Sequence, residues 1–311
     1  MKTILLAVFA FSLACGAQEK PIKKEEIKVN ALLNGTLYSP ELPLKSTDLV
    51  IIIAGSGLPD RDGNQAGMKN NSLRCFGERV GQDDIAAGSV DKRTIALMST
   101  GNTDEKDLVF DNFINDVKDI IAYFKSKKAY RHIIIAGHSE GSLIGMVAAF
   151  GNVDGFISIA GPGRTIDLVI AEQIGKQAPN LKEEVEKNLA LLKSGQTFKL
   201  ENQALSFLFR ESLQPYLISW IKYNPQIEIQ KLQIPVLLIN GTKDIQVPVS
   251  DAELLKKVKP DAQLKIINNM NHLFKEIKTD DLAENQAAYN NPDLPIAPEM
   301  VSAVNQFVKS L

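Results

Sequence analysis

A serine flanked by glycines is the residue of this chain best placed to do chemistry. The pentapeptide GHSEG spans residues 137–141, after the isoleucine-rich run 132–136 and before the apolar run 142–150. We therefore expect it to join a buried strand to a buried helix. On such a turn the serine has a strained backbone and its hydroxyl projects above the sheet edge, while the glycines prevent collisions with the neighbouring strand and helix. The pattern predicts that Ser139 is a nucleophile.

A serine hydroxyl becomes an effective nucleophile when a base accepts its proton and an acid orients that base. The sequence contains three histidines. We expect the side chain of His138 to point away from the base position, and we expect His132, which opens a strand, to be structural. His272 lies in a loop directly after the last predicted strand, 262–267, from which a base can reach back over the sheet edge. By elimination, His272 is the predicted base.

The acid is expected in a loop that follows a strand located between the nucleophile and the base. Asp244 follows the predicted strand 235–239 and is the predicted acid. Asp251 is the rival carboxylate, but it lies after Pro248 at the start of a predicted helix, where helix capping explains it. The predicted chain order is therefore Ser139, Asp244, His272.

Acyl transfer also needs hydrogen-bond donors aimed at the oxyanion that develops in the transition state. The backbone N–H of Glu140 is one predicted donor, because a helix N-terminus favours negative charge. The second is expected from the AGSG loop, 54–57, where we predict the N–H of Ser56, with Gly57 as the alternative. Neither zinc-ligand spacing nor a nucleotide-binding G-x-G-x-x-G in the right context occurs, so the sequence implies no metal and no cofactor.

Strand-like and helix-like segments alternate along the chain, which predicts an α/β fold with a mostly parallel sheet covered on both faces. The predicted strands are 27–30, 31–38, 49–53, 94–98, 132–136, 155–160, 235–239 and 262–267, and the predicted helices are 71–80, 109–126, 249–258, one from 139 and one from 298. Between 163 and 235 only helical periodicity continues. We interpret about 164–230 as a helical cap over the site, with ordinary packing helices as the alternative.

The N-terminus has the pattern of an export signal. A positive start precedes an apolar run at 4–13, which is too short for an ordinary membrane span, and small residues follow. We expect 1–17 to be a signal peptide cleaved after Ala17, with a lipoprotein acylated at Cys15 as the alternative. A solvated linker is expected over 18–30 and the folded domain over 31–311. The mature protein would be periplasmic or secreted.

The composition limits the classes of partner expected for the mature chain. A length of 311 residues with 44% hydrophobic residues allows one large core, and a net charge of −2 without a basic stripe argues against nucleic acid. Cleavage after Ala17 would leave Cys75 as the remaining cysteine, which excludes a disulfide within the mature chain. We expect Cys75 to be a half-buried structural residue on a helix.

The motifs together resemble the α/β-hydrolase superfamily over about 31–311, particularly exported bacterial esterases near the dienelactone hydrolases and serine aminopeptidases. The matching parts are 34–40, 55–64, 91–93, 137–141, Asp244 and 270–272. The resemblance implies the α/β-hydrolase fold, the triad Ser139, Asp244 and His272, and a bracing role for Asp60, Arg61 and Asp62 beside the oxyanion loop. One departure concerns 94–98, where TIALM stands in place of the glycine-rich turn that usually follows Asp-Lys-Arg.

The predicted function is hydrolysis of small carboxylic esters through an acyl-enzyme. A serine peptidase or aminopeptidase would use the same triad, but it would need carboxylates in the cap to hold a free amino terminus. Glu183, Glu184 and Glu186 are candidates, although a solvated helix face also explains them. A non-catalytic binding protein on a hydrolase scaffold is the third reading. It predicts the loss of a triad residue, and none is missing.

Overall fold

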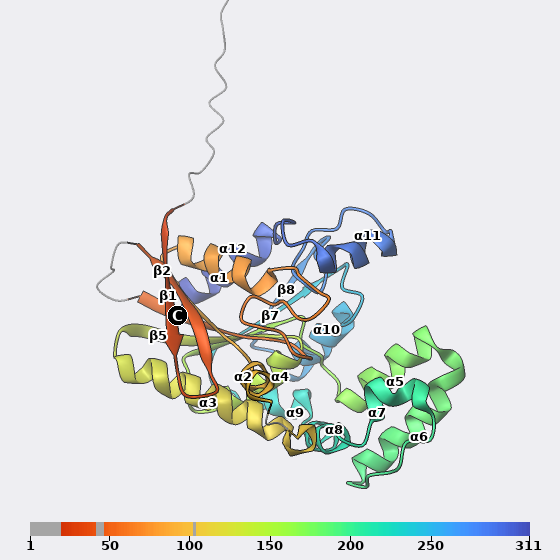
Figure 1. Cartoon of the computed structure of the whole chain (residues 1–311). Coiled ribbons are helices and arrows are strands. Elements are labelled where there is room, and N and C mark those ends of the chain that lie inside the picture. Colours follow the sequence, from red (N-terminus) through yellow and green to blue (C-terminus); the bar gives the residue numbers. More distant parts are fainter. Residues whose placement is uncertain (1–19, 42–46, 102–103) are drawn as a thin grey trace, which may run out of the picture.

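A computed structural model describes residues 20–41, 47–101 and 104–311, and the signal expected over 1–17 lies outside these ranges. In the described chain, eight strands form one sheet in the order β1-β2-β4-β3-β5-β6-β7-β8 (Figure 1). β1 with β2 and β2 with β4 pair antiparallel, and the other neighbours pair in parallel. The strands are β1 Ile22–Lys28, β2 Asn34–Pro40, β3 Thr47–Ile53, β4 Ala86–Val90, β5 Tyr130–His138, β6 Gly155–Ile159, β7 Val236–Gly241 and β8 Gln263–Ile267. The mostly parallel sheet predicted from the alternating pattern is confirmed.

Helices cover both faces of this sheet (Figure 1). One face carries α1 Ser72–Gln82 and α12 Pro298–Lys309, and the other carries α3 Phe110–Lys127, α4 Glu140–Ala149 and α10 Val249–Val258. The remaining α-helices are α2 Arg93–Thr100, α5 Ile166–Gln177, α6 Lys182–Lys193, α7 Ser206–Phe209, α8 Gln214–Ile221, α9 Pro225–Gln230 and α11 Leu282–Ala287. Cys75 lies half-buried on α1, as predicted.

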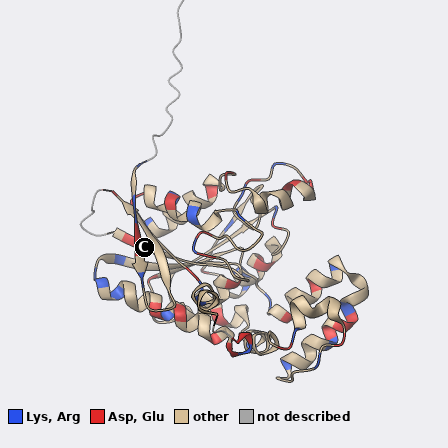
Figure 2. Ribbon diagram, in the orientation of Figure 1, with Lys and Arg blue, Asp and Glu red and all other residues tan. Residues whose placement is uncertain are grey.

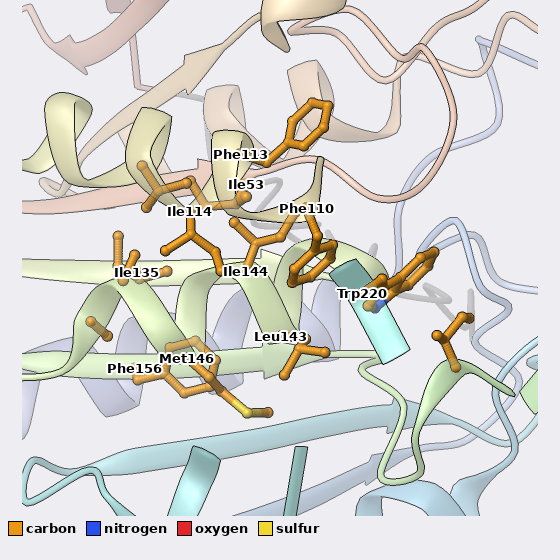
Figure 3. Packing of buried hydrophobic residues seen from close by; sticks show 14 of the residues in the cluster. Ile53, Phe110, Phe113, Ile114, Ile135, Leu143, Ile144, Met146, Phe156 and Trp220 are labelled. Carbon is orange, nitrogen blue, oxygen red and sulfur yellow. The ribbon is translucent and has the colours of Figure 1, made fainter. Parts of the chain in front are cut away.

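Alternating side chains of the central strands separate two hydrophobic cores. On β3, Ile51 and Ile53 belong to the core beneath α3 and α4, whereas Val50 and Ile52 belong to the core beneath α1 and α12. This period of two is what places side chains of a buried strand on both faces. Figure 3 shows Ile53 in the first core, close to side chains of α3 and α4. The sheet is therefore held from both sides, which makes its carboxyl edge a rigid platform for a site.

Two predictions of secondary structure are wrong. Residues 22–26, expected in a solvated linker, belong to the edge strand β1, which begins five residues before the predicted strand 27–30. Its charged side chains remain mostly exposed while its backbone pairs with β2. The segment 94–98 lies in α2 rather than in a strand, and the strand of this region is β4. β4 consists mainly of small residues, and its central glycine lies beneath a large ring: a Cβ at Gly88 would lie 2.9 Å from Cζ of Phe124. At Gly88, packing thus excludes the β-branched side chain by which a buried strand is usually recognised.

Between β6 and β7 the chain forms the helices α5 to α9, and α5 and α6 extend beyond one end of the sheet (Figure 1). The rings of Trp220 on α8 and Phe110 on α3 stack with centroids 5.4 Å apart, which ties this insertion to the core. Acidic and basic residues are interspersed over the sheet domain and the insertion (Figure 2). In the described ranges, no helix combines the length and hydropathy needed to cross a membrane.

Candidate active site

Ser139 occupies a strained turn between β5 and α4. Its φ is 54° and its ψ is −122°, a conformation that costs a non-glycine residue about 1–3 kcal/mol. The turn also requires glycine on both sides: a Cβ at Gly137 would lie 2.3 Å from the carbonyl oxygen of Gly141, and one at Gly141 would lie 2.5 Å from that of Ala54. The predicted need for the flanking glycines is confirmed. The surrounding backbone therefore holds Ser139 in a conformation that it would not adopt on its own.

His272 and Asp244 form a buried hydrogen bond at the carboxyl edge of the sheet. Nδ1 of His272 donates to Oδ2 of Asp244 over 2.8 Å, and the two side chains are 3% and 0% exposed. The other carboxylate oxygen accepts the backbone N–H groups of Gln246 and Val247 over 2.8 and 2.9 Å. Because a carboxylate only accepts, the proton of a neutral His272 ring is on Nδ1, and Nε2 carries a lone pair that can take a proton.

Ser139 and His272 line the same cavity, which has a volume of about 180 Å³. Ser56, the predicted source of the second oxyanion donor, also lines it, and Asp244 lies behind His272. Glu140 follows Ser139 as the first residue of α4. The rest of the wall mixes apolar and polar side chains, including Met68, Leu73, Gln65, Gln246 and Tyr289. The structure therefore brings the residues selected from the sequence to one edge of the sheet.

The prediction that His138 points away from the base is wrong. Nε2 of His138 donates to the backbone carbonyl oxygen of His272 over 2.9 Å, and the two ring centroids are 4.7 Å apart. Burial, reinforced by the neighbouring His272, lowers the pKa of His138 well below its ordinary value, so the ring is neutral. His138 thus supports the backbone of the loop that carries His272, a contact between residues 134 positions apart.

Helix capping does not explain Asp251. This residue lies in the first turn of α10 but makes no capping bond; it is fully buried, and its carboxylate accepts the backbone N–H of Gly163 over 2.9 Å. Arg164 adds two hydrogen bonds, from Nε over 3.0 Å and from Nη2 over 2.7 Å. Asp251 therefore anchors the start of the helical insertion to α10, and Asp244 is the carboxylate that contacts the histidine.

The loop that carries Ser56 is braced by its own polar residues. Arg61 donates to Asp91 from its backbone N–H over 2.7 Å and from Nη2 over 2.7 Å. Oδ1 of Asp60 accepts the backbone N–H groups of Asp62 and Asn64, each over 2.9 Å. These bonds agree with the bracing role that the resemblance implies for Asp60 and Arg61, whereas Asp62 takes part through its backbone.

Sequence reasoning missed a buried polar cluster beside the turn at Ser139. Nζ of Lys92 donates to the carbonyl oxygen of Gly55 over 2.9 Å and to Oε1 of Glu140 over 3.3 Å. The hydroxyl of Tyr216, from α8, donates to the same Glu140 oxygen over 2.5 Å. Burial and the charge of Glu140 raise the pKa of Tyr216 well above its usual value, so this hydroxyl remains a donor. Lys92 lies in the Asp-Lys-Arg segment noted in the sequence, but its partners come from other elements.

Sequence comparison relates the chain to an esterase. No protein-family model matches it. It is 26% identical to esterase EstD of Thermotoga maritima over 235 residues, which are 72% of this chain and 54% of EstD. The chain therefore spans about half the length of that curated relative.

Structural comparison supports the fold independently. Est1E from Butyrivibrio proteoclasticus matches with a TM-score of 0.56 and 16% identity, covering 90% of this chain and 98% of Est1E. The dienelactone hydrolase from Anabaena variabilis matches with a TM-score of 0.51 and 13% identity over 94% and 99% of the two chains. The bromoperoxidase from Bacillus anthracis matches with a TM-score of 0.50 and 12% identity over 92% and 100%. With its mostly parallel sheet, its helices on both faces and its serine turn after β5, the chain has the α/β-hydrolase fold that its motifs resemble.

Proposed function

We propose that this protein is a serine hydrolase that cleaves carboxylic esters, with Ser139 as nucleophile, His272 as base and Asp244 as the acid that orients the base. The observation that carries the proposal is the 2.8 Å bond from His272 Nδ1 to Asp244 Oδ2, buried at the wall of the cavity that Ser139 also lines. This bond holds the imidazole in the tautomer that can take a proton at Nε2. A base prepared in this way beside a strained serine suits nucleophilic catalysis.

The proposed reaction passes through an acyl-enzyme. Oγ of Ser139 attacks the ester carbonyl while Nε2 of His272 takes the hydroxyl proton, and Asp244 stabilises the resulting imidazolium. The backbone N–H groups of Glu140 and Ser56 donate to the developing oxyanion. The tetrahedral intermediate expels the alcohol, which receives the proton from His272. Water then attacks the acyl group with His272 as base, which releases the carboxylic acid and restores Ser139.

The comparisons and the structure both favour an ester as the substrate. EstD, the relative found by sequence, is named as an esterase. A peptidase would need cap carboxylates close to the serine, and the candidates lie on α6: Glu184 accepts a hydrogen bond from Asn202 and Glu186 pairs with Lys182. Among the described residues that line the Ser139 cavity, none of the three glutamates of α6 occurs. The carboxylates therefore offer no support for binding an amino terminus at the site.

The test compares the wild-type protein with Ser139→Ala and with Ser142→Ala. Ser142 is a matched control because it lies one turn further along the same helix and bonds Ser158 over 2.7 Å. The substrates are 4-nitrophenyl esters of graded acyl length and aminoacyl anilides. We expect ester turnover by the wild type and by Ser142→Ala, and none above background by Ser139→Ala.

Two results with the wild-type protein would contradict the proposal. Selective turnover of the anilides would assign the site to a peptidase. Inactivity of the wild type on every substrate, together with no labelling by a fluorophosphonate, would leave a binding protein on a hydrolase scaffold.

A further inference from the structure

We propose that Lys92 is a positioning residue that sets the geometry of the oxyanion hole, an inference that rests on the proposed function. Its ammonium group contacts both segments from which the oxyanion donors come. Nζ of Lys92 lies 2.9 Å from the carbonyl oxygen of Gly55 and 3.3 Å from Oε1 of Glu140. One buried cation thus holds the loop after β3 against the start of α4.

The contact with Gly55 controls the direction of the Ser56 N–H. The carbonyl of Gly55 and the N–H of Ser56 belong to one planar trans peptide, so they point in opposite directions. Fixing the carbonyl oxygen on Lys92 therefore aims the N–H away from Lys92. A hydrogen bond to a cation also polarises the peptide, which strengthens its N–H as a donor. Lys92 can in this way both orient the Ser56 donor and strengthen it.

The contact of Lys92 with the Glu140 carboxylate fixes the residue whose backbone N–H is the other proposed donor. Glu140 contributes its backbone N–H to the proposed oxyanion hole, and its carboxylate accepts from both Lys92 and Tyr216. Because this side chain is 1% exposed and bonded from two directions, the first residue of α4 has little freedom to rotate. Tyr216 belongs to α8, so the helical insertion reaches the oxyanion hole through Glu140.

The burial of this ion pair favours a role beyond stability. The side chain of Lys92 is 8% exposed, and its Nζ also lies 4.7 Å from the centroid of the Phe113 ring. Removing two charges from water offsets most of their attraction, so a buried pair is a poor way to stabilise a fold. Because the Lys92–Glu140 pair lies between the two proposed oxyanion donors, its role is to fix the positions of those donors.

The first test is Lys92→Met, which keeps the stem of the side chain and removes the donor. Deletion of one oxyanion donor lowers kcat by about 10²–10³, so a misaligned donor should lower kcat by about 10- to 100-fold with KM changed less than about threefold. The rate of labelling by a fluorophosphonate should fall in parallel. The matched control is Arg93→Met, which breaks the neighbouring pair with Asp116, 2.7 Å, and touches neither Gly55 nor Glu140. Its folded fraction should keep the wild-type kcat.

A double variant separates positioning from folding. Lys92→Met leaves the carboxylate of Glu140 buried with Tyr216 alone, whereas Lys92→Met/Glu140→Gln removes both charges and keeps the Glu140 backbone N–H. We expect the double variant to keep the wild-type circular dichroism spectrum and still to show the lowered kcat, because the Gly55 carbonyl has no partner from Lys92. Lys92→Arg should recover part of the lost kcat.

The outcomes distinguish this inference from the proposed function. A folded double variant with wild-type kcat, or loss of folding in both Lys92→Met and the double variant, would overturn the positioning role. A wild-type protein that turns over no ester and takes no fluorophosphonate label would instead overturn the proposed function.

Discussion

His138 and His272 lie ring against ring, with centroids 4.7 Å apart, and His138 donates its Nε2–H to the backbone carbonyl of His272. The residue before the proposed nucleophile therefore supports the loop of the proposed base. Phe274 completes the contact, with its ring centroid 4.7 Å from that of His138. Burial within this packing lowers the pKa of His138 and keeps its ring uncharged.

We predict that His138 makes the stability of the protein depend on pH. Burial lowers its pKa well below the ordinary 6.5, so the unfolded chain takes up a proton that the folded chain excludes. Its contribution to the unfolding free energy is thus complete above pH 6.5 and is lost as the pH falls below that value, with a slope of at most about 1.4 kcal/mol per pH unit. Urea unfolding at several pH values between pH 5 and pH 8 measures this dependence. His138→Gln, which can keep the donor to His272, should flatten the slope, and an unchanged slope would contradict this account.

Replacement by asparagine should impair catalysis at Asp244 but stability at Asp251. Asp244→Asn should lower kcat by about 10²–10⁴ because the imidazole loses its orienting anion, while the fold persists because an amide oxygen still accepts from Gln246 and Val247. Asp251→Asn should lower the unfolding free energy by about 1–3 kcal/mol through the weakened bonds to Arg164, with kcat nearly unchanged. Kinetics and denaturant unfolding on both variants check this, and a larger loss of kcat in Asp251→Asn would reassign the acid.

Two glycine-to-alanine substitutions should change the stability of the protein in opposite directions. Gly137→Ala places a Cβ 2.3 Å from a backbone oxygen and should destabilise the protein by about 3 kcal/mol or more. Gly175→Ala, inside α5, meets a flexible lysine side chain at 3.2 Å and should stabilise it by about 0.5–1 kcal/mol, because alanine favours a helix. Thermal and urea unfolding compare the two. Equal tolerance of both would show that the serine turn is not closely packed.

The proposed catalytic residues could be selected from the sequence because the topology is regular. Ser139 follows β5, Asp244 follows β7 and His272 follows β8, and parallel strands place their carboxyl ends at one sheet edge. Because each of the three residues follows a parallel strand, the sequence is sufficient to predict that they lie at the same sheet edge. The flanking glycines followed from the same local geometry.

The features that could not be predicted depend on contacts between residues that are far apart in the sequence. β4 is poor in β-branched residues, and at Gly88 the ring of Phe124 packs where a side chain would lie. The orientation of His138 depends on the distant His272 loop. The partners of Lys92 come from three separate elements. Long-range packing, rather than propensity, decides each of these features.

We propose that the chain is exported and that the mature form begins at Gln18. Expression of the full-length gene in a bacterial host, followed by mass spectrometry of the processed protein, should give this N-terminus. Cys15→Ser serves as the control and should be processed in the same way as the wild type. An acylated Cys15 at the mature N-terminus, lost in Cys15→Ser, would show a lipoprotein instead.

The role of Ser139 as nucleophile is tested by finding the residue that a fluorophosphonate modifies. Intact mass and peptide mapping of the treated wild type should show one adduct, on Ser139, formed at the same rate at which ester hydrolysis is lost. Asp244→Asn should form the adduct more slowly, and Ser139→Ala should form none. An adduct on another residue, or ester hydrolysis that survives in Ser139→Ala, would contradict the account.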